Sequence, residues 1–270
     1  MKKYIPLLIG SFYSFSAFSF EITSKIQEGS LIYGQLNKDE KLLIGSTEII
    51  PTKEGRFFFG LPQDSTKLNL TLIHPDGKKE IKNFAVEKRK WKEEIITGLQ
   101  PEKVTPSNKN TKRIQQENHL LKKARSTMNT SFFPTCFERP VKKFKRISSP
   151  FGARRILNNI KKAGHSGVDY AAPIGTPLYA PTDGIVALVH NDMFLSGKTL
   201  LINHGYGLFS SYSHLNKIAV KEGTVVKKGQ LIAEIGNTGR STGPHLHYTI
   251  TWHGTRLDPE QQIEDFICEK

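Results

Sequence analysis

The chain has 270 residues, of which 37% are apolar, and a formal net charge of +14. This length suits one large domain or two modest ones. Beyond the first twenty residues no stretch is long and apolar enough to span a bilayer as a helix. Residues 78–146 hold 19 Lys/Arg against 7 Asp/Glu, whereas residues 147–270 hold 12 against 10. The basicity therefore belongs to the middle of the chain.

The N-terminus has the pattern of a secretory signal. Met1-Lys2-Lys3 supplies positive charge, residues 4–20 are apolar and aromatic apart from Gly, Ser and one Pro, and Ala17-Phe18-Ser19 places small residues where a signal peptidase cuts. We predict a signal peptide over residues 1–19, and hence secretion across the inner membrane to the periplasm or cell envelope. An uncleaved membrane anchor is the alternative.

Residues 20–90 are predicted to form a small all-β domain, a sandwich or a barrel. Short runs rich in apolar, β-branched and aromatic residues alternate here with turn-forming residues. The runs are Leu42–Ile44, Thr47–Ile50, Arg56–Phe59 and Leu68–Ile73. This spacing indicates antiparallel strands rather than βαβ units.

Residues 91–146 are predicted to be a basic linker with one helix. Residues 101–111 are polar and contain proline, and roughly helical spacing of apolar residues follows within Lys112–Met128. The basic stretch 78–146 has two interpretations: contact with an anionic polymer or a membrane surface, or a solvated linker. No nucleic-acid-binding motif accompanies it, so we expect no specific nucleic-acid partner.

Residues 147–270 are predicted to form an antiparallel β-sheet domain punctuated by glycines. The strand candidates lie within Gly175–Val189, Thr199–Asn203, Gly207–Tyr212, Leu231–Ile235 and His245–Ile250. Cys136 and Cys268, the two cysteines of the chain, flank this region. In an oxidising compartment they are expected to form a disulfide, with two free thiols as the alternative.

Four histidines and one aspartate in this region have the spacing of a metal site. Residues two apart on a strand share a face, so His245 and His247 project together, and the same holds for His165 and Asp169 at a spacing of four. His214 is expected to end an aromatic strand. Imidazole and carboxylate donors suit zinc, and three protein ligands leave a fourth position for a reactive water.

These motifs resemble the LytM/lysostaphin-type family of zinc metallopeptidases, which cleave peptide cross-links of peptidoglycan. The family pattern of His-x-x-x-Asp, a later His-Leu and a closing His-x-His is met, and the resemblance covers about Ser148 to Pro259. It implies that one zinc ion per catalytic domain is bound by three residues, and that two histidines are catalytic without being permanent ligands. The ligands are His165, Asp169 and His247, and the catalytic residues are His214 and His245.

The sequence leaves open which of the two catalytic histidines is the base and which stabilises the oxyanion. The loop Arg240, Ser241 and Thr242, with glycines on both sides, is expected to form a wall against the substrate. We therefore predict a secreted zinc endopeptidase acting on the peptide cross-links or stems of peptidoglycan. The alternative is an inactive cell-wall-binding protein or amidase activator of the same fold. The N-terminal domain is a candidate to shield the cleft. Oligomeric state is not determined by the sequence.

Overall fold

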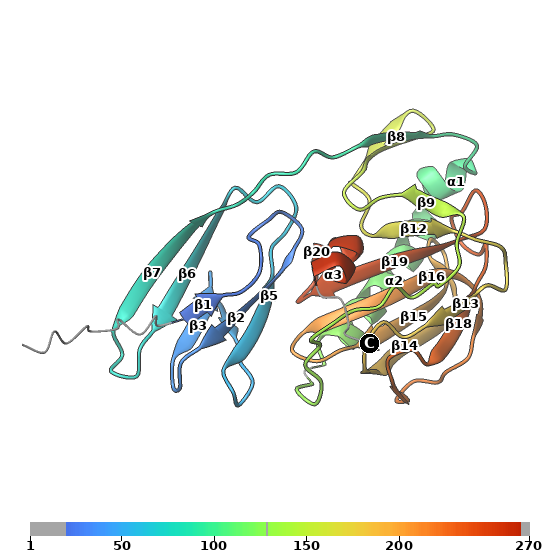
Figure 1. Ribbon diagram of the computed structural model, residues 1–270. Coiled ribbons are helices and arrows are strands. Elements are labelled where there is room, and N and C mark those ends of the chain that lie inside the picture. The colour runs from blue at the N-terminus through green and yellow to red at the C-terminus, as the bar shows by residue number, and fades with distance from the viewer. Residues whose placement is uncertain (1–19, 128, 266–270) are drawn as a thin grey trace, which may run out of the picture.

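The computed structural model describes residues 20–127 and 129–265, and strands dominate it (Figure 1). The predicted signal peptide at residues 1–19 lies outside the described residues. So does Cys268, so that the Cys136–Cys268 disulfide stays a prediction. Among the described residues, no helix is both long and apolar enough to cross a membrane. The predicted fold class, mainly β, is confirmed.

The first part of the chain forms two small antiparallel sheets that enclose an apolar core. One sheet has the order β1-β2-β5 and the other β4-β3-β6-β7. Alternation explains the packing, since Leu68, Leu70 and Leu72 of β6 are buried while their neighbours are not. The strands are β1 (Phe20–Ile22), β2 (Leu31–Leu36), β3 (Lys41–Ile44), β4 (Thr47–Ile49), β5 (Arg56–Gly60), β6 (Lys67–Ile73) and β7 (Lys79–Ala85).

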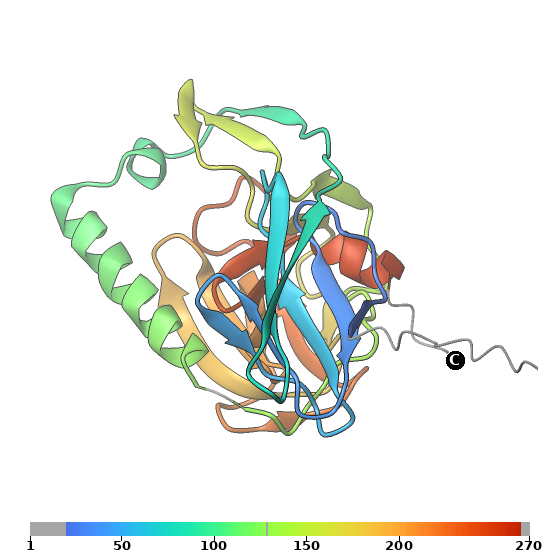
Figure 2. The ribbon, with the colours of Figure 1, turned by 90° about the vertical axis from the view of Figure 1, so that its left-hand side faces the viewer.

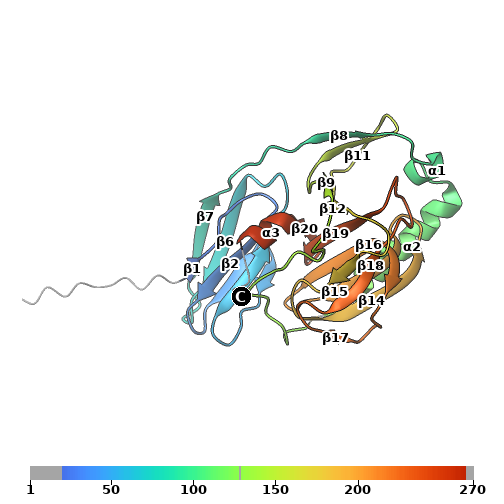
Figure 3. The ribbon, with the colours of Figure 1, turned by 45° about the vertical axis from the view of Figure 1, so that its right-hand side comes forward.

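The segment predicted as a linker is more ordered than expected. It contains a strand, β8 (Glu93–Ile96), and two helices, α1 (Pro101–Val104) and α2 (Asn108–Arg125). The strand β8 pairs in parallel with β10 (Arg154–Leu157), which pairs with β11 (Ile160–Lys162); Figure 3 shows this small sheet beside the large one. The expected single helix corresponds to α2. The sequence did not predict β8, because its pairing partner β10 lies about sixty residues away and local spacing carries no information on such distant pairing.

Helix α2 packs against β14 (Gly184–Met193), as Figure 2 shows, and the apolar residues Ile114, Leu121 and Ala124 are half-buried, but two positions differ from the expected face. Leu120 is exposed, whereas Glu117 is buried. The Glu117 carboxylate accepts hydrogen bonds from the backbone N–H of Phe194, at 2.9 and 3.0 Å, and from Nε of Arg113 at 2.7 Å. A charge-assisted contact thus anchors the helix to the sheet domain.

The C-terminal part is built on one large antiparallel sheet with the order β17-β14-β15-β16-β19-β12-β9. Strands β13 and β18 pair with each other, β18 also pairs with β16, and β20 pairs with β19. The remaining elements are β9 (Arg146–Ser149), β12 (Val168–Ala171), β13 (Pro177–Tyr179), β15 (Gly197–Asn203), β16 (Leu208–Ile218), β17 (Val225–Val226), β18 (Leu231–Ile235), β19 (His245–Trp252), β20 (Thr255–Leu257) and α3 (Pro259–Asp265).

The two β regions meet at the C-terminal end of β19. Strand β5 contacts β19 and β20, and the rings of Phe59 and Trp252 are 6.5 Å apart between centroids. A Cβ on Gly60 would lie 3.0 Å from Cβ of Trp252, so a larger residue here would push the two regions apart by a few tenths of an ångström. The histidines of β19 lie at its other end. The N-terminal sheets therefore pack away from the candidate site.

Candidate metal centre

The register of two neighbouring strands places an aspartate beside a histidine. In the antiparallel pair β12–β19, Asp169 lies directly opposite His247, so their side chains emerge on the same face at close range. His245 shares that face because it lies two residues before His247 on β19. His165 precedes β12, and its backbone N–H donates to the carbonyl of Ala153. Strand pairing therefore assembles residues that are about 80 positions apart.

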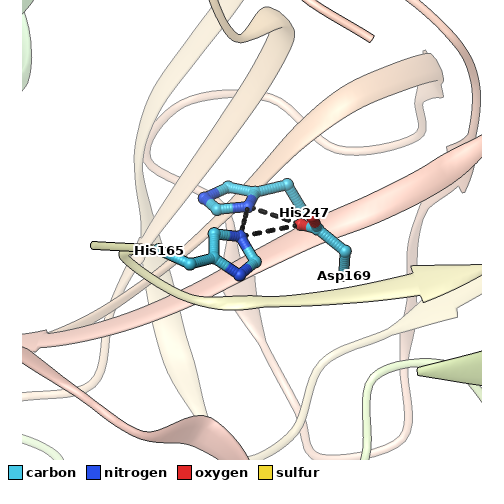
Figure 4. A group of neighbouring side chains, drawn as sticks. All are labelled: His165, Asp169 and His247. Carbon is cyan, nitrogen blue, oxygen red and sulfur yellow. Dashed lines mark hydrogen bonds and ion pairs between the residues drawn. The ribbon is translucent and has the colours of Figure 1, made fainter. Parts of the chain in front are cut away.

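Three donor atoms converge at this point (Figure 4). Oδ1 of Asp169 lies 3.0 Å from Nε2 of His165 and 2.7 Å from Nδ1 of His247, and the two nitrogens are 2.9 Å apart. His165 and Asp169 are buried, with exposed fractions of 2% and 6%. A buried triangle of one carboxylate oxygen and two imidazole nitrogens is a donor set that suits zinc.

The second nitrogen of each ring has a partner that orients the ring. Nδ1 of His165 lies 2.9 Å from the carbonyl oxygen of Pro150, and because a carbonyl can only accept, this nitrogen carries the proton. Its Nε2 then offers a lone pair to the cluster. For His247, Nε2 lies 3.1 Å from the hydroxyl of Thr249, which leaves Nδ1 facing the cluster. Such supporting contacts are typical of metal-binding histidines.

Asp169 is held by an arginine on its other side. Arg155 donates to Oδ2 at 2.7 Å, which leaves Oδ1 directed at the two histidines. Burial by itself raises the pKa of Asp169, but its contacts with the neighbouring His165 and His247 outweigh burial and hold that pKa well below its usual range. Burial lowers the pKa of His247 to about 4. At neutral pH the site therefore holds an ionised carboxylate and a neutral His247, the state in which both act as ligands.

His214 reaches the cleft through a strained backbone. It was expected to end its strand, but β16 continues to Ile218, and His214 lies within it at φ +63°, in the left-handed region that residues with a Cβ rarely adopt. Its N–H donates to the carbonyl of Ser196 at 2.7 Å. Beyond this residue, β16 changes its partner from β19 to β18. This irregularity directs the ring into the cleft.

The two histidines outside the donor triangle share one tautomer. Nδ1 of His214 lies 2.7 Å from the carbonyl of Thr238, and Nδ1 of His245 lies 2.8 Å from that of Gly243. Both rings therefore carry the proton on Nδ1 when neutral and present an unprotonated Nε2. Their centroids are 4.7 Å apart. Burial, and then the neighbouring histidines, lower the pKa of His214 to about 3.

A cleft of about 540 Å³ contains all five predicted residues. The loop residues Arg240, Ser241 and Thr242 line it as well, and the Ser241 hydroxyl lies 3.1 Å from Nδ1 of His245. Among the described residues, the lining from outside the sheet domain comes from positions 96–125 and none of it from 20–90. The N-terminal domain, expected as a shield, therefore does not cover the cleft. Helix α2 forms one of its walls.

Sequence reasoning missed the residues that support the ligands. Arg155, Pro150 and Thr249 have no spacing motif that marks them, because a carbonyl, a hydroxyl and an arginine are common everywhere. The one available signal was that Thr249 continues the alternation of His245 and His247 along β19. The contact of Arg155 with Asp169 depends on β10, which is positioned only by tertiary pairing.

Comparison with known proteins agrees with this site. Residues 163–259, which include all five histidine and aspartate positions, match the model of peptidase family M23. A solved Pseudomonas aeruginosa structure assigned to peptidase M23 superposes with a TM-score of 0.69 at 26% identity, covering 90% of this chain and 97% of that chain. The fold is thus shared over nearly the whole length.

Two curated relatives match the C-terminal part. The peptidoglycan DD-endopeptidase ShyA of Vibrio cholerae is 47% identical over 144 residues, which are 48% of this chain and 33% of that protein. The DD-carboxypeptidase/endopeptidase Mpg of Neisseria meningitidis is 42% identical over 118 residues, which are 43% of this chain and 26% of that protein. The matched part thus spans a third or less of these relatives.

Proposed function

We propose that the chain is a member of peptidase family M23 through residues 163–259, and that it is a zinc-dependent endopeptidase that hydrolyses peptide cross-links or stems of peptidoglycan. The observation that carries the proposal is the buried triangle of Asp169 Oδ1, His165 Nε2 and His247 Nδ1, with two more imidazoles in the same cleft. The names of the relatives support peptidoglycan as the substrate.

The donor set of His165, Asp169 and His247 fits one zinc ion. When bound, zinc would polarise the scissile carbonyl and lower the pKa of a water molecule. The supporting contacts fit as well, because the second nitrogen of each ligand histidine and the second oxygen of Asp169 are already engaged.

His214 and His245 are the candidates for proton transfer. Each presents Nε2 to the cleft while a backbone carbonyl holds the proton on Nδ1. One of them accepts a proton from the attacking water at Nε2, and the other, once protonated there, donates to the developing oxyanion. Their shared tautomer leaves the two roles open. No carboxylate other than Asp169 lines the cleft among the described residues, so histidine performs the acid–base work.

Two further parts of the proposal concern location and surface contacts. The signal-like residues 1–19 support secretion to the periplasm or cell envelope. Contact of residues 78–146 with an anionic polymer or membrane surface would rest on its lysines and on the exposed Arg146, because Arg89, Arg113 and Arg139 pair with carboxylates of the protein itself and Arg125 lines the cleft. The inactive binding protein or activator is the weaker alternative, since all five residues of the site are present and assembled.

The proposal is tested by digesting purified murein and identifying the released fragments by mass spectrometry. We expect cleavage of amide bonds in the peptide part, loss of cleavage after treatment with a strong chelator, and recovery when zinc is restored. His119→Ala is a matched control, since His119 is exposed on α2 and outside the cleft. Cleavage that persists unchanged after chelation would contradict the metal mechanism.

A further inference from the structure

The cleft continues beyond the metal centre along β19. His245, His247, Thr249 and Thr251 alternate along the strand and all line the cleft. Thr251 lies four residues from His247, a separation of about 14 Å at about 3.4 Å per residue. The neighbouring β16 adds Ser211 and Ser213 to the same lining. A row of hydroxyl side chains therefore extends along the floor of the cleft away from the donor triangle. An extended peptide can bind along this row.

The far end of this floor has an unused hydrogen-bonding group. Thr251 is only 4% exposed, and its Oγ1 is buried without a hydrogen-bond partner among the described residues. Burying a hydroxyl without a hydrogen-bond partner is destabilising, so such groups in native proteins call for an explanation. Because Thr251 lines the cleft, a bound ligand would supply the missing partner.

Two arginines stand at the same end. Arg256 is the cross-strand partner of Thr251 on β20, and Arg125 is the last residue of α2; both line the cleft. Asn118, Leu121 and Arg125 are spaced three and four residues apart, so the helix turns one continuous face toward it. The two guanidinium groups thus come from segments that are 131 positions apart and line the same cavity.

Neither arginine has a carboxylate partner in the described part of the chain. Arg89, Arg139 and Arg155 each form an ion pair with a carboxylate, whereas the described residues offer none to Arg125 or Arg256. Nε of Arg125 is buried without a hydrogen-bond partner in the described part of the chain. Burial, and next the positive charge of Arg256, lower the pKa of Arg125. The two neighbouring positive charges repel each other, and a bound anion would relieve this repulsion.

We propose that the Arg125–Arg256 end of the cleft binds a carboxylate of the peptide substrate. The inference rests on the proposed function, because it assumes that a peptide stem lies in the cleft. A carboxylate is the anion that such peptides carry, and an arginine fork binds it through paired N–H donors. Allowing for the length of the arginine side chains, the carboxylate would lie roughly three extended residues from the scissile bond. Arg125 lies outside residues 163–259, which match the family model. Helix α2 would therefore add this preference for a carboxylate to the matched domain.

The test measures binding of an uncross-linked stem peptide to the zinc-loaded protein by calorimetry. The probe is used as the free acid and with its carboxylates converted to carboxamides. We expect the free acid to bind about 10–100-fold more tightly, in line with 1.5–3 kcal/mol for charged hydrogen bonds. The double variant Arg125→Gln/Arg256→Gln should remove that preference and leave the affinity for the amide unchanged. The variant Arg125→Lys/Arg256→Lys should retain part of it. Thermal unfolding checks that each variant is folded.

Kinetics on cross-linked stem dimers give the second readout. For the free-acid dimer, KM should rise about 10–100-fold in the double Gln variant while kcat stays within about twofold, since uniform binding is what is lost. Arg146→Gln is the matched control, because Arg146 is exposed on β9 and does not line the cleft. Equal affinity of the wild type for acid and amide would overturn the inference. Because binding needs no turnover, a wild type that binds the acid but cleaves no murein would refute only the proposed function.

Discussion

The buried His204 and the two histidines of the donor triangle, all in the same sheet domain, differ in the partners of their ring nitrogens. His204 is fully buried, with Nδ1 2.8 Å from the carbonyl of Asp183 and Nε2 2.7 Å from the hydroxyl of Ser210. In the donor triangle, His165 and His247 each give one nitrogen to a protein partner and turn the other toward Asp169. A histidine satisfied at both nitrogens is structural, whereas one with a lone pair aimed at other donors is a ligand.

The sharpest test of this contrast is removal of a ligand. His247→Ala should release zinc and lower murein cleavage by at least about 10³-fold, because the remaining donors, His165 and Asp169, make an incomplete set. Zinc content by elemental mass spectrometry and fragment release from murein measure the two effects. His204→Gln is the paired variant and should keep its zinc. Zinc loss in the His204 variant alone would reverse the assignment.

Within the cleft, the contrast extends to the two histidines outside the triangle. His214→Ala should keep zinc and lower kcat by about 10²–10⁴-fold, because proton transfer or oxyanion stabilisation is lost while the donors remain. The same outcome is expected for His245→Ala. The measurements are zinc content and turnover on cross-linked stem dimers. If His214→Ala and His247→Ala lose zinc equally, the separation of ligands from catalytic residues is wrong.

The structural histidine should reveal itself in the pH dependence of stability. Burial lowers the pKa of His204 from 6.5 to about 4, so the unfolded chain binds a proton there before the folded protein does. The free energy of unfolding therefore falls as the pH drops from about 6.5 to about 4, by about 3 kcal/mol from this group. Urea unfolding between pH 7 and pH 4 measures it. His204→Gln should be less stable at pH 7 but show a flatter profile, and an unchanged slope would contradict the assignment.

The smallest expected effect concerns the group that orients Asp169. Arg155→Gln removes the donor to Oδ2 and should weaken zinc binding by about 10–100-fold, as loss of a supporting contact to a metal ligand does. Competition with a chelator of known affinity measures the change. Arg154→Gln is the matched control, because Arg154 is exposed on the same strand. Equal zinc affinities in the two variants would show that Asp169 does not need its arginine.

The five site residues and the strands that carry them could be predicted because their signals are local. Alternation places His245 and His247 on one face whatever the strand pairs with. His165, by contrast, lies before β12 rather than on it, so the shared strand face expected for His165 and Asp169 is not what brings them together. The mainly β fold followed from short apolar runs between turn formers in the same way. These are consequences of backbone geometry, which every sequence with this spacing shares.

Helix α2 shows where local patterns mislead. The apolar residue Leu120 is exposed, while Glu117 is buried because the N–H of Phe194 and the guanidinium of Arg113 meet its carboxylate. The linker strand β8 likewise exists because β10 is available to pair with it. A charged residue can occupy an interior position only where partners converge on it, and those partners are distant in sequence.

By itself the sequence determined which residue types lie on one strand face and that residues 163–259 match the model of peptidase family M23. Only the tertiary structure decided which polar groups are satisfied and which are left open. Arg155 contacts Asp169, His204 donates to one oxygen and accepts a hydrogen bond from another, and Arg125 lies near Arg256 with no carboxylate partner among the described residues. The physical reason is that hydrogen bonds and ion pairs act over a few ångströms in space, and the fold alone brings distant parts of the chain that close.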